Sequence, residues 1–159
     1  MNNNLLPLTG FKMAVGENQF KLLQHFAVSA NMPGVNIAEV STTFRNLSGY
    51  VPSDHISYDA LNVRVAVDEN MHVYDEVFSW LSSCTTSNIL PVHDIVLNFL
   101  TSKFNITRSV SFKNVFPVSI SSIEFNVQNT EVDYAYIDVG FRYDNFTFDL
   151  GPDRLQRPA

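Results

Sequence analysis

Four histidines and one cysteine are the side chains in this sequence that most readily bind metals or act as acids, bases and nucleophiles. They are His25, His55, His72, His93 and Cys84. Metal-binding motifs place two ligands within a few residues of each other, and no pair among these five has that spacing. A single cysteine forms no intrachain disulfide. The sequence therefore predicts no metal site and no cofactor.

Two of these side chains have neighbours that bear on a catalytic interpretation. His93 precedes Asp94; such a pair can belong to an acid–base or metal site, but we prefer a turn residue next to the start of a strand. Cys84 lies in a Ser/Thr-rich run without an adjacent base, as expected for a structural thiol. The glycines form no phosphate-binding loop, no Gly-x-Ser-x-Gly turn is present, and the carboxylates are scattered. An enzyme on a β-sandwich is a further alternative, but the sequence identifies no catalytic residue for it.

The charge composition bears on the kind of partner. Charged residues make up 16% of the chain and the net charge is −6, against a charged share of about 25% in average soluble domains. A weakly charged surface favours a protein that buries much of its exterior against partners. No cluster of Lys or Arg is present, which argues against tight duplex DNA binding. A mildly acidic protein would still let DNA slide past without sticking to it.

The N-terminal residues do not resemble a targeting segment. Residues 1–8 contain no charged region and no long apolar run, so we expect no signal peptide. No stretch of the chain approaches the roughly 18 apolar residues of a membrane-spanning helix. We therefore expect a protein that is made in a reducing cytoplasm and has no membrane partner.

Alternation of apolar and polar residues with a period of two dominates the chain and predicts strands. Strands are expected at 11–15 and 20–28, joined by a hairpin turn at 16–19, and at 35–45. Residues 56–67 give the clearest pattern, with a bulge near residues 59–60. Their apolar face would contain Leu61, Val63, Val65 and Val67, and their polar face Asn62, Arg64 and Ala66.

The segment between these strands is rich in turn residues but also carries large apolar side chains. Residues 46–55 include Leu47, Tyr50 and Val51, which an ordinary exposed loop does not need. We interpret the segment as the tip of a long hairpin arm that meets another molecule, with Pro52 in the same contact. The alternative is a loop that folds back on the core of its own chain.

One amphipathic helix is expected after Asp68, whose carboxylate can cap the first turn. Val73, Val77 and Leu81 lie four residues apart and form an apolar stripe, with Trp80 at its margin. The helix should end in residues 82–88, a run of poor helix formers. Its simplest role in a β protein is to close an open end or face of the sheets.

Strand patterns fill the rest of the chain, at 94–101, 105–113, 118–128, 132–143 and 146–150, with a turn at 129–131. Residues 151–159 form a polar tail that we expect to be flexible. The sequence thus predicts an all-β fold with one helix, in which residues 1–150 form a single domain. Two packed antiparallel sheets or a flattened β-barrel would bury the apolar faces, and a long hairpin arm would extend from them.

Three blocks of sequence resemble the tail tube proteins of contractile-tailed bacteriophages, a family related to the tube proteins of type VI secretion systems. The blocks are ANMPGVNIAEV at residues 30–40, YDALNVRVAVDE at 58–69 with FSWL at 78–81, and FKNVFPVSIS at 112–121 with YIDVGFRY at 136–143. The first resembles the family's entry into its second sheet, the second its strand, acidic turn and helix, and the third its aromatic-proline turn and last long hairpin. Together they span most of residues 30–143 in the family's order.

The resemblance implies a structural protein with no catalytic site and no cofactor. Six copies would form a ring, and stacked rings a hollow tube that DNA crosses without specific binding. The implied partners are further copies of the chain, a contractile sheath around the tube, and baseplate and terminator proteins at its ends. The protein would be assembled in the host cytoplasm and reside in the virion tail.

The two ends of the chain depart from the family's tube subunits, which leaves other functions open. A baseplate tube-initiator or a tube-terminator ring of the same fold is the first alternative. A ligand-binding β-barrel is the second alternative, and it would need an apolar cavity and a stable monomer.

Two sets of residues are then expected to carry the function. The arm would contact the next ring through Leu47, Tyr50, Val51 and Pro52. The polar faces of the strands would supply the residues that face the channel, namely Asn62, Arg64, Glu124, Asn126, Asp138 and Arg142. Ordinary exposure to solvent predicts the same polar pattern, so the sequence does not distinguish the two.

Overall fold

The computed structural model describes residues 5–17 and 19–149, which form nine strands and two helices. In chain order the elements are β1 (Phe11–Val15), α1 (Lys21–Phe26), β2 (Ala27–Asn31), β3 (Val35–Phe44), β4 (Leu47–Tyr58), β5 (Leu61–Ala66), α2 (His72–Thr86), β6 (His93–Leu100), β7 (Ile106–Ile120), β8 (Tyr136–Arg142) and β9 (Asn145–Phe148). The predicted fold of packed antiparallel sheets with an arm is confirmed, although it has two helices and the sheets do not close into a barrel. The tail predicted at 151–159 lies outside the described residues.

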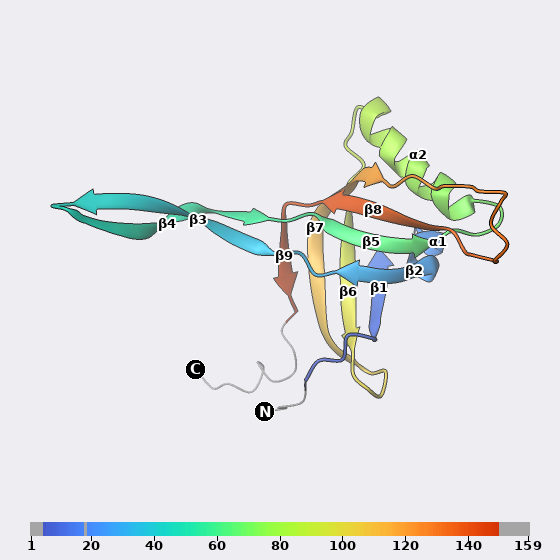
Figure 1. Cartoon of the computed structure of the whole chain (residues 1–159), viewed down its shortest axis with the longest axis horizontal. Coiled ribbons are helices and arrows are strands. Elements are labelled where there is room, and N and C mark those ends of the chain that lie inside the picture. Colours follow the sequence, from blue (N-terminus) through green and yellow to red (C-terminus); the bar gives the residue numbers. More distant parts are fainter. Residues whose placement is uncertain (1–4, 18, 150–159) are drawn as a thin grey trace.

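Strand β7 belongs to two sheets, because it bends in its middle. Its first half pairs with β6 and β9 in a sheet that also contains β1, here called sheet A. Its last residues, 116–120, pair with β8 in a sheet that continues through β5 to β2, here called sheet B. Asn114 at the bend has a left-handed backbone with a φ of 54°, which Asn tolerates better than most residues. The strands of the two sheets cross in Figure 1, as in packings whose corner strand changes sheet.

The hydrophobic core lies between the two sheets. Sheet A contributes Val15, Ile95, Leu97, Val110 and Phe112, and sheet B contributes Leu61, Val63, Val65, Ile137, Val139 and Phe141. The predicted alternation of β5 is confirmed, because its three apolar residues are buried and Asn62 and Arg64 between them are exposed. No polar or charged residue is buried in the described part of the chain. Apolar burial, worth about 1.5–3 kcal/mol per large side chain, therefore stabilises this core.

Helix α2 packs against one end of the sheets through Val73, Val77 and Trp80 (Figure 1). Trp80, predicted at the margin of the apolar stripe, is 3% exposed, and its Nε1 donates a hydrogen bond of 2.8 Å to the Pro91 carbonyl. Leu81, predicted within the stripe, is only half-buried. The stripe is therefore shifted by one residue, because the larger indole ring with a hydrogen-bonding N–H occupies the buried position.

Helix α2 begins later than predicted and ends within the predicted run of residues 82–88. The Asp68 carboxylate accepts a hydrogen bond from the Val73 N–H at 3.1 Å, so it caps the first turn as predicted, but the helix begins at His72. The same hydrogen bond lowers the pKa of Asp68. The helix continues to Thr86, through most of the predicted stop at 82–88. Hydroxyl groups in its last turns donate hydrogen bonds to carbonyls three or four residues back, so these side chains satisfy their polar groups within the helix.

The hairpin predicted at the N-terminus is wrong. Residues 21–26 form helix α1, and β1 pairs with β6 instead of with the segment that follows it. The helix buries Leu23, whose N–H donates a hydrogen bond of 2.9 Å to Glu76 Oε2 on α2. Packing against α2 and the good helix propensity of the Lys-Leu-Leu-Gln run override the strand-like alternation of residues 20–28.

The strands predicted at 118–128 and 132–143 are shorter than expected. Strand β7 ends at Ile120 and β8 begins at Tyr136, so residues 121–135 form a long loop that includes the predicted turn at 129–131. Asn126 Oδ1 accepts a hydrogen bond of 2.9 Å from the Gln128 N–H. Such local turns compete with strand pairing. The strands predicted at 105–113 and from 118 onward are parts of one strand, β7.

A two-stranded arm projects from the body of the protein (Figure 1). Strands β3 and β4 form a sheet of their own, joined by Arg45 and Asn46, whose φ angles of 46° and 68° are typical of tight hairpin turns. The predicted hairpin arm is confirmed, but residues 46–55 form most of its return strand and not only its tip. The single strand predicted at 56–67 with a bulge at 59–60 is wrong, because residues 59–60 separate β4 from β5 and the two strands belong to different sheets.

Candidate assembly surfaces

The distal half of the arm, residues 40–51, has one apolar and one polar face. Val40 lies opposite Val51, and Phe44 lies opposite Leu47. Residues directly opposite each other share a face of the ladder and successive residues alternate, so these four side chains form one surface, here called the distal apolar face. Phe44 and Leu47 are 75% and 76% exposed. Exposed apolar surface of this kind is typical of an interaction site.

The four predicted arm residues do not all point the same way. Leu47 and Val51 belong to the distal apolar face, whereas Tyr50 lies opposite Ser41 on the reverse face. Pro52 shares the face of Tyr50, because the two lie two residues apart in β4. All four are exposed. Tyr50 and Val51 therefore cannot both contact one flat surface, and the arm offers contacts on both faces.

The apolar side of the arm changes face halfway along its length. Near the body, Val35 lies opposite Tyr58 and Ile37 lies opposite Ile56, and the register shifts between Ile37 and Glu39. Ile37 and Glu39 are two residues apart on β3, so Ile37 shares the face that is polar further out. The extra residues of β4 at this point form a bulge. The arm therefore exposes apolar side chains on opposite faces in its proximal and distal halves.

The root of the arm is fixed to the body by an aromatic cluster. The Tyr58 ring lies 5.4 Å from the Phe146 ring and 5.8 Å from the Tyr143 ring, between centroids. Tyr143 Oη donates a hydrogen bond of 2.8 Å to the Asp59 carbonyl, and burial raises the pKa of Tyr143. These contacts anchor the arm at Tyr58, whereas Ile37 and Ile56 beyond it are each 53% exposed, as is the distal apolar face at its end.

Four of the six predicted channel residues lie together on the outer face of sheet B. Arg64 on β5 lies opposite Asp138 on β8, and Asn62 lies opposite Gly140. Arg142 is four residues beyond Asp138 on β8, and therefore on the same face. The four polar side chains are exposed, and the residues between them in β5 and β8 point into the core.

The polar face of sheet B is wider than the sequence predicted. Ser29 and Asn31 of β2 lie opposite Arg64 and Asn62 and extend it by one strand. The sequence pattern did not predict these two residues, because the strand expected at 20–28 ends before them. The Arg64 guanidinium lies 5.0 Å from the centroid of the Tyr136 ring, which holds its side chain along the face. With Asp138 and Arg142 the face carries charges of both signs.

The other two predicted channel residues, Glu124 and Asn126, lie in the loop of residues 121–135 and not in a strand. Both are exposed. Among the residues that the structure describes, no strand pairing aligns them with the outer face of sheet B. A position in the channel stays a prediction for all six residues.

The same loop exposes large apolar side chains that were predicted to lie in strands. Phe125, Val127, Val132 and Tyr134, here called the loop patch, are 76%, 100%, 89% and 75% exposed. Two backbone hydrogen bonds of 3.0 Å, from Ser121 N–H to the Asp138 carbonyl and from Val67 N–H to the Ala135 carbonyl, hold the ends of the loop to sheet B. The sequence signal was their alternation, but among the described residues no strand pairs with this segment.

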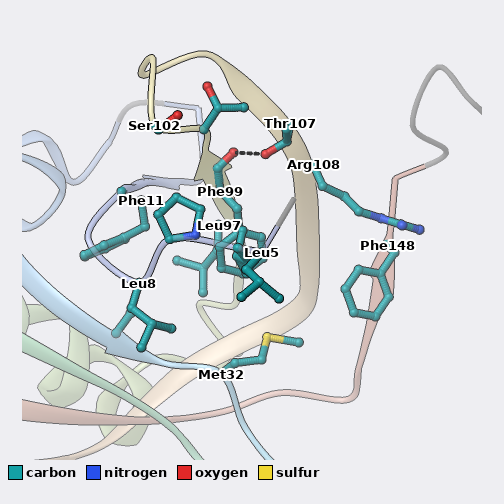
Figure 2. Close-up of a pocket in the computed structure, with 15 residues that line it drawn as sticks. Leu5, Leu8, Phe11, Met32, Leu97, Phe99, Ser102, Thr107, Arg108 and Phe148 are labelled. Atoms are coloured by element: carbon teal, nitrogen blue, oxygen red, sulfur yellow. Dashed lines mark hydrogen bonds between the residues drawn. The ribbon is translucent and has the colours of Figure 1, made fainter. Parts of the chain in front are cut away.

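An apolar groove of about 630 Å³ lies beside the N-terminal segment and sheet A (Figure 2). Its walls include Leu8, Phe99 and Phe148. The Arg108 guanidinium lies 5.1 Å from the Phe148 ring, the Thr107 hydroxyl donates to the Phe99 carbonyl at 3.0 Å, and the Thr101 hydroxyl accepts two backbone hydrogen bonds, so these three polar groups are already engaged. Small-molecule sites combine an apolar cavity with converging polar groups. The groove therefore gives little support to the ligand-binding alternative.

The reactive side chains singled out by the sequence have structural contacts. The His93 ring packs against Phe20 and Trp80, 5.1 Å and 5.4 Å between centroids, and Asp94 forms a 3.0 Å ion pair with Lys113. Burial raises the pKa of the Cys84 thiol, which makes it a poorer nucleophile. In residues 5–17 and 19–149 no group of three or more His, Cys, Asp or Glu could hold a metal ion. No helix among these residues is long and apolar enough to cross a membrane.

Three solved structures align with nearly the whole chain, although their sequence identity of 16–18% shows the fold alone. They are the tube-terminating cap of the anti-feeding prophage (16% identity, 94% of this chain and 93% of that chain, TM-score 0.71), the PVC sheath/tube terminator of an extracellular contractile injection system (16%, 93% and 99%, 0.72), and a PVC sheath-tube complex (18%, 92% and 93%, 0.67). No curated protein sequence matches the chain. A family model described as phage tail tube protein matches residues 6–149. The chain therefore belongs to the phage tail tube protein family, whose members are structural proteins and not enzymes.

Proposed function

We propose that this protein is a subunit of the tail tube of a contractile phage tail, in which six copies form a ring and rings stack around a channel for DNA ejection. The arm carries the proposal. It is a hairpin that stands apart from both body sheets and exposes an apolar face. A two-stranded hairpin is marginally stable alone in water. In a protein of the tube family, another copy of the chain would cover and stabilise this hairpin.

In the proposed tube the arm reaches the next ring and is covered on both faces. Leu47 and Val51 would contact one neighbouring surface, and Tyr50 and Pro52 would contact another. Tyr50 is the aromatic side chain on the reverse face, and buried aromatic residues contribute strongly to interface stability. Contacts of this head-to-tail kind repeat from copy to copy; they form a ring when the rotation closes and an open stack when it does not.

The outer face of sheet B is the proposed channel wall. Asn62, Arg64, Asp138 and Arg142 expose polar groups there, and the opposite charges of Arg64 and Asp138 lie on paired positions. DNA binds strongly to surfaces that concentrate Lys and Arg. A wall of mixed charge would hold the phosphate backbone weakly and let the genome pass without specific binding.

The proposed partners outside the subunit are a tail sheath around the tube and baseplate and terminator proteins at its ends. Aligned proteins come from a sheath-tube complex, a sheath/tube terminator and a baseplate. The protein would be assembled in the host cytoplasm and remain in the tail of the virion.

A ring that begins or ends the tube is the second candidate function, because two of the aligned structures are tube terminators. Electron microscopy of the purified chain, alone and with sheared tail tubes as seeds, separates the candidates. A repeating subunit forms long tubes or extends the seeds. A terminator or initiator stops at a single ring and blocks further growth. A chain that stays monomeric and leaves the seeds unchanged would contradict both.

A further inference from the structure

We propose that the distal apolar face of the arm of one copy docks on the loop patch of a second copy. The proposal rests on the proposed self-assembly and adds the receiving surface. The arm tip and the 121–135 loop lie at opposite ends of the longest dimension of the molecule (Figure 1). The arm of one copy therefore cannot reach its own loop patch, whereas the arm of a neighbour displaced along this direction can. Opposed complementary surfaces are what a repeating head-to-tail contact requires.

The two surfaces match in their apolar content. The arm presents Phe44 and Leu47 at its end, and the loop presents Phe125 and Val127, all more than 70% exposed. Isolated apolar side chains at a surface are normal, but series of large, highly exposed ones are typical of interfaces. Contact between the two surfaces would remove the exposed apolar side chains of both from water.

The two surfaces also match in their charge. Arg45 is the one charged residue between positions 40 and 52 of the arm, and its guanidinium lies 5.8 Å from the Phe44 ring, beside the distal apolar face. The 121–135 loop contains Glu124, Glu131 and Asp133 and no basic residue. Arm-to-arm contact would bring two Arg45 side chains together, and loop-to-loop contact would bring two acidic clusters together. Only the arm-to-loop contact pairs opposite charges, which steers partners and selects the register.

A charge reversal with rescue tests this contact. Arg45→Glu should raise the protein concentration needed for assembly at least about tenfold, because like charges then face each other. Adding Glu131→Arg and Asp133→Arg to the same chain should restore assembly to near the original concentration. The matched control combines Arg45→Glu with Asp149→Arg, since Asp149 is an exposed acid outside the loop, and it should not restore assembly. Equal assembly of all four chains would overturn the proposal.

Cysteine cross-linking tests the same contact by distance. In a Cys84→Ser background, a Leu47→Cys chain mixed with a Val127→Cys chain should form a disulfide-linked dimer, and a Leu47→Cys chain mixed with an Asp149→Cys chain should not. Negative-stain micrographs of the same mixtures report assembly separately. Tubes or rings without the Leu47–Val127 cross-link would overturn the docking proposal and leave the proposed function standing. Monomers without any cross-link, with or without tube seeds, would overturn both.

Discussion

Replacing Phe44 and Leu47 together by serine should leave the monomer intact and prevent its assembly. Both side chains are about three-quarters exposed in the isolated chain, at 75% and 76%. Surface substitutions outside packed sites change stability by about 0.5 kcal/mol or less. The free energy of unfolding of the monomer should therefore change little.

The expected effect on assembly follows from the area still available for burial. Complete burial of a Phe or Leu side chain is worth about 1.5–3 kcal/mol. Three-quarters of that value is roughly 1–2 kcal/mol for each residue, or about 2–4 kcal/mol for each arm contact. A difference of this size weakens the contact roughly 30- to 700-fold.

Analytical ultracentrifugation over a range of concentrations measures assembly, and thermal unfolding followed by circular dichroism measures the stability of the monomer. Thr43→Ala with Ser48→Ala is the matched control, because this pair lies on the reverse face of the arm, adjacent to the two apolar residues. An unchanged assembly threshold for the Phe44 and Leu47 variant would refute the reasoning. A large fall in its unfolding temperature would also refute it, since the two residues would then support the monomer itself.

Three further substitutions and one pH experiment test other parts of the structure. Tyr50→Asp should give a folded chain that no longer polymerises, and normal tubes in micrographs would show that the reverse face of the arm is not used. Asp138→Lys should let tubes form but slow DNA ejection, because a third cation on the outer face of sheet B would attract phosphates; unchanged ejection kinetics would argue against a channel position. Trp80→Ala should lower the free energy of unfolding by about 3–5 kcal/mol in chemical denaturation, because it opens a cavity under α2. Asp68→Ala should lower the unfolding temperature at pH 7. The difference from the parent chain should shrink as the pH falls through the depressed native pKa of Asp68, because the parent chain then also loses the capping charge. A difference in unfolding temperature that is the same at pH 7 and pH 2 would contradict that role.

The parts of the fold that follow from local pattern could be predicted from the sequence. Leu61, Val63 and Val65 alternate with polar residues because β5 has one buried and one exposed face. The hairpin arm was predicted from the strand pattern that contains Val35 to Phe44 and from the apolar residues after the turn, and the structure has such an arm. These features need no knowledge of distant neighbours.

The parts that depend on distant contacts could not be predicted. Helix α1 forms where the sequence alternates like a strand, because Leu23 is buried against α2. Strand β7 changes sheet at Asn114, whose N–H donates to Asp94 Oδ1 at 3.2 Å and whose Nδ2 donates to Asp144 Oδ2 at 2.6 Å. Both acceptors come from segments separated from Asn114 by many residues. Tertiary contacts of this kind override local propensity.

The candidate site could also be predicted only in part, namely where its residues follow a local pattern. Alternation identified the polar residues of β5 and β8, including Asn62 and Asp138, and strand pairing then placed them on one face. The loop patch was not predicted, because Phe125 and Val127 alternate with polar residues as a strand would. Whether such a segment becomes a strand depends on a partner strand, and within this chain the segment has none among the described strands.

Electron cryomicroscopy of the assembled protein tests the central claim most directly, since it shows what covers the arm. The predicted result is a hollow assembly in which every arm lies against a neighbouring copy, with Leu47 buried at the contact and Arg64 and Asp138 on the inner wall. An assembly whose arms extend freely into solvent, or one whose inner wall is built from sheet A, would contradict it.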